Sequence, residues 1–368
     1  MDRNTRINWI NRLLLPLLNV LTAFAATAVI FLLIDVNPVE ATKILLYGAF
    51  GYEEGIGYTL YYATNFIFTG LAVAIAFHAG LFNIGGEGQA YIGGLGSTLI
   101  ILAIDPGASV WIFVPASIMG GLLFGALWAL IPAYLQAYRG SHIVITTIMF
   151  NFIASSLMVY LLVNVLREVG QMQPQSAFFP SASWLPFMHN LFANFGVTIE
   201  QSPLNLSLFL ALFFCFLTWV FIWHTRWGYA IRATGLNSTA AVYAGIKPKQ
   251  IIILSMCISG ALAGLVGINE LVGYQHRLLL DFHFGYGFGG IAVSLMGRNH
   301  PIGIIIAAIL FGILYQGGAE LAFEMSNISR DIVVVMQALI ILFCGALQYM
   351  YRPWLIRTLA PIQEQSHG

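Results

Sequence analysis

Long uninterrupted apolar runs recur along almost the whole sequence, and they constrain the fold more than any other feature. A helix needs about 20 apolar residues to cross a bilayer, and every backbone polar group must find a partner inside it. Only 8% of the 368 residues are charged, whereas soluble domains carry roughly 25%. The sequence therefore predicts an all-α polytopic membrane protein and excludes a soluble enzyme, a nucleic-acid-binding protein and a disordered chain.

We expect about ten membrane-crossing helices within a single membrane domain, 1–368. The first run contains Ala23-Phe24-Ala25, which resembles a signal-peptide cleavage site. Hydrophobicity continues to Ile34, however, so an uncleaved first helix is favoured. The expected crossings are Leu13–Ile34, Thr59–Ala79, Ile84–Ala103, Val110–Gln136, Ile143–Leu166, Leu204–Trp223, Ile251–Val272, a short segment Tyr286–Gly297, Pro301–Phe323 and Asp331–Tyr351.

The distribution of lysine and arginine predicts the orientation of the chain. With this set of crossings and a cytoplasmic N-terminus, the inside loops carry most of the basic residues, which agrees with the positive-inside rule. Both termini are then cytoplasmic. The inside residues are Arg3, Arg6, Arg12, Arg139, Arg226, Arg232, Lys247, Lys249, Arg298, Arg352 and Arg357, and the outside residues are Lys43, Arg167, Arg277 and Arg330.

Two polar loops stand out between the apolar runs. The outside loop 167–203 contains four prolines and several aromatic residues, which suit a cap over the outer mouth, a docking surface or a variable connection. The inside loop 225–250 contains helix signals, because Asn237 is a good N-cap, Gly245 suits the C′ position and Pro248 stops continuation. We expect a short helix over Ser238–Ala244 on the cytoplasmic face, either as a simple connector or as a docking surface.

Each half of the chain contains a glycine-rich break before a short apolar segment, at Gly80–Gly88 and at Gly285–Gly290. Paired interruptions of this kind indicate a weak two-half repeat with a transport site at its interface. The second break spells GxGxxG, but no strand precedes it, so a dinucleotide site is discarded. The pairs Gly121/Gly125 and Gly260/Gly264 favour close helix packing.

Polar side chains inside the apolar runs are candidates for a solute path, because placing them in a membrane is unfavourable. A structural role in helix packing is the competing interpretation for each of them. Glu87 in particular could bond backbone amides freed by the break, and Glu270 could snorkel to the outer interface. The candidate path residues are Phe77, Phe82, Asn83, Glu87, Gln89, Thr147, Asn151 and Glu270.

Four stretches resemble the permease subunits of ABC importers, in the branched-chain amino acid/ribose/simple-sugar permease family and its nucleoside-type or simple-sugar branch. They occur in the family's order along both halves of the chain. The stretches are GLFNIGGEGQ at 80–89, RG at 139–140 with TTIMFN at 146–151, RATGLN at 232–237 with AAVYAGI at 240–246, and GFGGIAV at 287–293 with GRNHPIG at 297–303.

The resemblance implies a transport subunit of a bacterial inner membrane, without catalytic or metal-binding residues of its own. A separate ATP-binding subunit binds and hydrolyses ATP, a second permease subunit completes the pore, and an extracytoplasmic solute-binding protein delivers a nucleoside or simple sugar. The resemblance assigns coupling to the ATP-binding subunit to Arg232, Asn237, Ala240, Tyr243, Ala244 and Gly245.

An ion-coupled secondary transporter is the alternative that the sequence leaves open. In such a carrier Glu87 and Glu270 would be the coupling carboxylates. The chain has no GxxxxGK[ST] motif for nucleotide binding, so any use of ATP requires another chain.

Overall fold

A computed structural model describes residues 14–33, 35–168 and 170–325, together with isolated residues beyond 325. This part of the chain forms helices and isolated β-bridges, without a β-strand, so the all-α prediction is confirmed there. The chain divides into two compact units, one of residues 1–48 with 313–368 and one of residues 49–312.

The smaller unit contains α2 (Leu15–Leu33), most of α3 (Pro38–Phe50) and the end of α14 (Pro301–Glu324). In this unit α3 and α14 pack closely. A Cβ added to Gly317 would lie only 2.2 Å from the carbonyl oxygen of Leu45, so glycine permits this contact. The sequence prediction missed α3, although Asn37 caps it by accepting from the Val39 amide and Pro38 is its first residue. The predicted last crossing, Asp331–Tyr351, lies largely outside the described residues.

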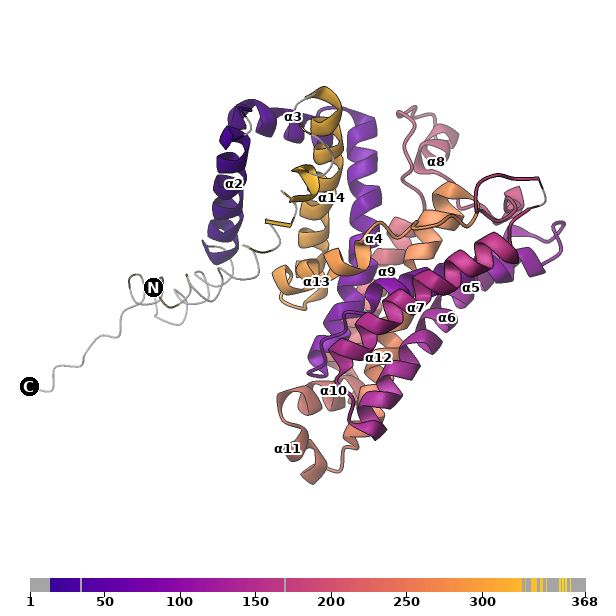
Figure 1. Ribbon diagram of the computed structural model, residues 1–368, viewed down its shortest axis with the longest axis vertical. Coiled ribbons are helices and arrows are strands. Elements are labelled where there is room, and N and C mark those ends of the chain that lie inside the picture. The colour runs from indigo at the N-terminus through magenta and orange to yellow at the C-terminus, as the bar shows by residue number, and fades with distance from the viewer. Residues whose placement is uncertain are drawn as a thin grey trace, which may run out of the picture. The chain divides into compact units, whose positions relative to one another are not determined.

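The larger unit is built around α4 (Glu53–His78), which has the most buried apolar window of the candidate membrane spans in the described residues. In the most apolar window of α4, 83% of residues are buried, against 28% in α6, α7 and α9. A membrane protein turns apolar side chains toward lipid as well as toward its core, which explains the exposed apolar faces of those three helices. The surrounding helices, shown in Figure 1, are α5 (Gly86–Ala103), α6 (Val110–Arg139), α7 (Ile143–Asn164), α9 (Ser207–His224), α12 (Pro248–Gly264) and α13 (Tyr286–Met296).

Within the described residues, six helical segments are long and apolar enough to cross a membrane. They are Glu53–His78, Val110–Arg139, Ile143–Asn164, Ser207–His224, Pro248–Gln275 and Pro301–Glu324, with α13 as a shorter apolar helix. The predicted first and third crossings also coincide with helices, α2 and α5. The chain is therefore a multi-pass membrane protein.

Glycines allow α5, α6 and α12 to pack backbone against backbone. A Cβ on Gly125 would lie 2.2 Å from the Gly260 carbonyl oxygen, and one on Gly93 would lie 2.2 Å from the Gly264 Cα. Lipid tails are as apolar as leucine, so membrane helices associate through close contacts of this kind. The predicted packing role of the two glycine pairs in α6 and α12 is confirmed.

The two polar loops lie at opposite ends of the larger unit, as Figure 1 shows for α8 (Met188–Asn194) and α11 (Ser238–Tyr243). The predicted helix over Ser238–Ala244 is confirmed with a shorter span. The sequence prediction missed α10 (Arg226–Leu236), which directly precedes α11. The Thr225 hydroxyl caps α10 by accepting from the Gly228 amide, a helix-start signal that the sequence already contains.

Candidate functional site

The two glycine-rich breaks bring the N-termini of α5 and α13 into backbone contact. Gly80 and Gly285 adopt left-handed φ angles of 73° and 82°, which glycine tolerates best. Gly85 directly precedes α5, as Gly285 directly precedes α13. A Cβ on Gly287 would lie 2.2 Å from the backbone nitrogen of Glu87, so only glycine permits this approach.

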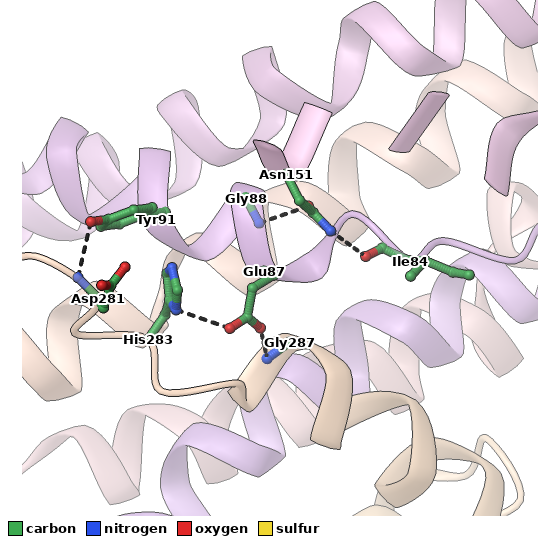
Figure 2. Close-up of polar contacts among 8 residues, drawn as sticks. All are labelled: Ile84, Glu87, Gly88, Tyr91, Asn151, Asp281, His283 and Gly287. Atoms are coloured by element: carbon green, nitrogen blue, oxygen red, sulfur yellow. Dashed lines mark hydrogen bonds and ion pairs between the residues drawn. The ribbon is translucent and has the colours of Figure 1, made fainter. Parts of the chain in front are cut away.

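The Glu87 carboxylate sits where these two helices meet, and the residue is only 7% exposed. The Gly287 amide donates to its Oε2 at 2.6 Å, and Nδ1 of His283 lies 2.9 Å from its Oε1, as Figure 2 shows. Helix N-termini carry unpaired amides and a partial positive charge, which stabilise an anionic group. Glu87 therefore joins the two helix starts.

A second contact holds the chain before α13 against α5. The His283 ring meets the Tyr91 ring edge-on with centroids 4.3 Å apart, and the Asp281 amide donates to the Tyr91 hydroxyl at 2.9 Å (Figure 2). Tyr91 lies one turn after Glu87 on α5. Glu87 and Tyr91 therefore both hold residues 281–287, at and before the start of α13, against α5.

Asn151 on α7 holds the first break in place through two hydrogen bonds to its backbone. Its Oδ1 accepts from the Gly88 amide at 2.9 Å, and its Nδ2 donates to the Ile84 carbonyl at 3.0 Å (Figure 2). Thr147 lies one turn earlier against Gly85, but its hydroxyl donates to the Ile143 carbonyl of its own helix. The helix-to-helix contact is therefore made by Asn151.

Asn83 and Gln89 form a reciprocal amide pair across the break. Nδ2 of Asn83 donates to Oε1 of Gln89 at 2.9 Å and to the Ser259 hydroxyl at 2.8 Å. The Ser259 hydroxyl in turn donates to the Ala72 carbonyl of α4 at 2.6 Å. This chain of hydrogen bonds ties the break to α4 and α12.

Phe77 and Phe82 flank the break as a stacked pair with ring centroids 5.2 Å apart. Phe82 is 37% exposed, unlike the buried polar residues beside it. Among the candidate path residues, these two aromatic residues and the five polar residues Asn83, Glu87, Gln89, Thr147 and Asn151 gather around the first break.

Glu270 belongs to a different cluster, on the π-helical segment η3 (Ile268–Gln275) that follows α12. The expectation that it could snorkel to the interface is wrong, because the residue is 1% exposed and accepts from Nδ2 of Asn65 at 2.6 Å. Tyr286, the first residue of α13, also places its hydroxyl within hydrogen-bonding reach of this carboxylate. The start of α13 thus contacts both carboxylates.

Asn269 is the hub of that second cluster. Its Nδ2 donates to Oδ1 of Asn65, and its Oδ1 accepts from Nδ2 of Asn205 and from the Ser207 hydroxyl. These bonds connect α4, η3 and the start of α9. The adjacent Asn269-Glu270 pair in an apolar run was the available sequence signal for this cluster.

Helix α11 exposes most of its residues at one end of the unit, although Ala241 is buried. The Asn237 side chain accepts from the Ala240 amide at 3.0 Å, and Gly245 adopts a φ of 78° beyond Ala244. Tyr243 is 90% exposed and Ala240 is also exposed. Arg232 is half-buried on α10. Because α10 directly precedes α11, the predicted coupling residues lie on one continuous segment.

The site also depends on residues that were not among the predicted path residues. His283 and Gly287 complete the Glu87 contacts, while Asn65 bonds to Glu270 and is itself bonded by Asn269. The glycine pattern at 285–290 was a usable signal, but it reflects close backbone approach rather than phosphate binding. His283 had no recognisable pattern, because its role depends on a fold contact with a residue about 200 positions away.

Comparison with known proteins places these features in a family. A family model described as "Branched-chain amino acid transport system / permease component" matches residues 55–344. No solved structure matches the chain.

Three similar curated proteins cover nearly the whole chain. The guanosine ABC transporter permease protein NupP of Bacillus subtilis is 35% identical, over 92% of this chain and 94% of its own. The nucleoside ABC transporter permease protein NupB of Lactococcus lactis is 35% identical over 93% and 92%, respectively. The glucose ABC transporter permease protein TsgB13 of Haloferax volcanii is 33% identical over 92% and 88%.

Proposed function

The chain belongs to the branched-chain amino acid transport system permease family, and on that premise we propose that it forms the translocation path of an ATP-driven importer for a nucleoside or a simple sugar. Near full-length similarity to permeases named for guanosine, nucleosides and glucose carries this proposal. The ion-coupled secondary transporter receives no support from these relatives.

We propose three protein partners. A separate ATP-binding subunit binds and hydrolyses ATP and docks on loop 225–250, where α11 exposes Ala240 and Tyr243. A second permease subunit, identical or homologous, completes the pore. A solute-binding protein docks on the opposite loop, 167–203, where Phe178 and Trp184 are exposed.

The proposed topology extends the fold of the described residues. A single permease domain, 1–368, crosses the bacterial inner membrane about ten times in two related halves, with both termini in the cytoplasm. The two glycine-rich breaks, which meet through Glu87 and Gly287, are the corresponding points of the halves. The excess of lysine and arginine on the inside loops supports this orientation.

We place the solute path at the first break and along the α13 N-terminus. Interrupted helices near the middle of the membrane are typical of transport sites, because they expose backbone groups to a ligand. The proposed path residues are Phe77, Phe82, Asn83, Glu87, Gln89, Thr147, Asn151 and Glu270.

Reconstitution tests the proposed function. The chain is purified with its ATP-binding subunit and the second permease, placed in proteoliposomes and supplied with solute-binding protein. Uptake of radiolabelled guanosine and glucose is then measured with ATP, without ATP and with a proton gradient. We expect uptake that requires ATP. Uptake that follows the proton gradient and ignores ATP would contradict the proposal.

A glycine substitution tests the docking role of α11. Gly245→Val forces a β-branched residue into a left-handed conformation, which typically costs about 1–3 kcal/mol, although no atom lies within 4 Å of an added Cβ. We expect weaker copurification of the ATP-binding subunit. Gly140→Val is the matched control, because Gly140 has a similar φ of 70° and equally open space at the end of α6. Equal copurification of both variants with wild type would count against this role.

A further inference from the structure

The end of α10 is in direct backbone contact with the turn that ends α4. A Cβ added to Gly235 would lie 2.2 Å from the His78 carbonyl oxygen and 2.8 Å from the Gly80 amide nitrogen. Both obstacles are main-chain atoms, so no side chain can rotate away to make room. Gly235 is two residues before Asn237, the N-cap of α11.

The same turn is also held by the segment that follows α13. Nε2 of His78 lies 3.0 Å from the Asn299 carbonyl oxygen in the turn between α13 and α14. The Ser294 hydroxyl near the end of α13 donates to Oδ1 of Asn299 at 2.8 Å. Trp223 at the end of α9 packs edge-on against the His78 ring, with centroids 5.3 Å apart.

Short, well-braced segments connect this turn to both helix N-termini of the candidate site. Residues 79–85 lead from it to the start of α5 and are fixed by the Asn83 and Asn151 hydrogen bonds. On the other side, α13 runs from Gly287 at the site to the turn that contains Asn299. The His78–Gly80 turn is therefore connected to both helices that start at Glu87, to α5 through residues 79–85 and to α13 through the turn that contains Asn299.

We propose that the contact of Gly235 with His78–Gly80 is a mechanical joint that transmits movement of α11 to the N-termini of α5 and α13. Close-packed backbone resists compression, so displacement of α10 must either carry the turn with it or open the contact. This inference rests on the proposed docking of an ATP-binding subunit at α11. It assigns Gly235 as a positioning residue, distant from the solute.

Gly235→Ala tests the joint in the complete complex. The added methyl must push α10 away from the turn, while the exposed surface of α11 stays unchanged. We expect wild-type copurification of the ATP-binding subunit and retained ATP hydrolysis, with ATP-driven uptake reduced at least tenfold. The control is Gly107→Ala, whose added Cβ would lie 3.4 Å from the nearest atom, an ordinary contact, and which should transport normally. Normal uptake by an assembled Gly235→Ala complex would overturn the proposal.

Hydrogen exchange on the wild-type complex decides the question if the variant does not assemble. We expect the amides of residues 79–85 to change their exchange rates between the nucleotide-free and ATP-trapped complexes, with residues 105–108 of the turn between α5 and α6 as the reference. Identical exchange at 79–85 in both states would overturn the joint. If the wild-type chain never binds an ATP-binding subunit, the proposed function fails instead.

Discussion

Two buried carboxylates meet the same helix N-terminus through different partners. Glu87 accepts from a backbone amide at the start of α13 and lies beside the His283 imidazole. Glu270 accepts from the Asn65 side chain and lies among neutral polar groups on a π-helical segment. The Glu87 cluster depends on the close approach of two main chains, whereas the Glu270 cluster depends on side-chain amides that connect three segments.

The difference shows how a fold accommodates an acidic residue at membrane depth. The Glu87 carboxylate lies at two helix N-termini and beside an imidazole, so it faces the partial positive charge that helix starts carry. Neutral donors satisfy the oxygens of Glu270, but they compensate less of the desolvation that an ionised carboxylate suffers. We therefore expect the stability of the fold to depend on the charge of the Glu87 side chain, but on the hydrogen-bonding geometry of the Glu270 side chain.

The largest effect is expected where the Glu87 cluster depends on the backbone. Gly287→Ala places a methyl 2.2 Å from the Glu87 nitrogen, and overpacking of this kind costs about 3 kcal/mol at the upper end of its usual range. The facing variant Gly86→Ala is the control, since its Cβ would lie 3.5 Å from the nearest atom, an ordinary contact. Thermal unfolding in detergent, followed by tryptophan fluorescence, measures both. A smaller loss for Gly287→Ala than for Gly86→Ala would refute backbone contact between the helix starts.

A pair of isosteric substitutions compares the two carboxylates directly. Glu87→Gln should lower the free energy of unfolding by about 1–2 kcal/mol, because it removes the charge that the helix N-termini stabilise. Glu270→Gln keeps an oxygen acceptor for Asn65 among neutral neighbours, so it should be neutral or stabilising within about 1 kcal/mol. The same unfolding assay ranks the two variants. The reverse ranking would show that Glu270 is the residue whose charge matters.

Sequence patterns predicted the elements of this site better than its contacts. Apolar length located the membrane helices, and cap chemistry located α11 between Asn237 and Gly245, because both signals are local in sequence. The pairing of Glu87 with Gly287 and His283 joins residues about 200 positions apart, and no local pattern encodes such a contact.

Burial is the second property that local patterns could not give. Glu270 lies close to the end of its apolar run, which suggested access to the interface. In the structure the loop after α7 folds over this end, with the Phe179 amide bonded to the His276 carbonyl and the Leu185 amide bonded to the Val272 carbonyl. The loop 167–203, for which the sequence left a cap, a docking surface and a variable connection open, thus helps to bury the polar cluster.

The smallest expected effect concerns the outer end of the Glu270 segment, where His276 follows η3 and stacks on Trp184 with ring centroids 3.9 Å apart. Burial lowers the pKa of His276 below its ordinary value of 6.5. The unfolded chain therefore takes up the proton first as the pH falls through 6.5, and the folded state loses stability in that window. Above pH 6.5 both states are neutral at this residue, and its contribution to stability is fully present.

His276→Asn isolates this contribution, because asparagine does not titrate and tolerates the left-handed φ of 54° at this position. Thermal unfolding midpoints measured at pH 8 and pH 5 should fall less in the variant than in wild type, because every other side chain is common to both proteins. An equal fall in both proteins would mean that acid acts elsewhere, and the outer end of the Glu270 cluster would then be insensitive to pH. A smaller fall in the variant would instead show that the contact of loop 167–203 with the Glu270 cluster is sensitive to acid. Among the described contacts, the Glu87 cluster has no such covering loop.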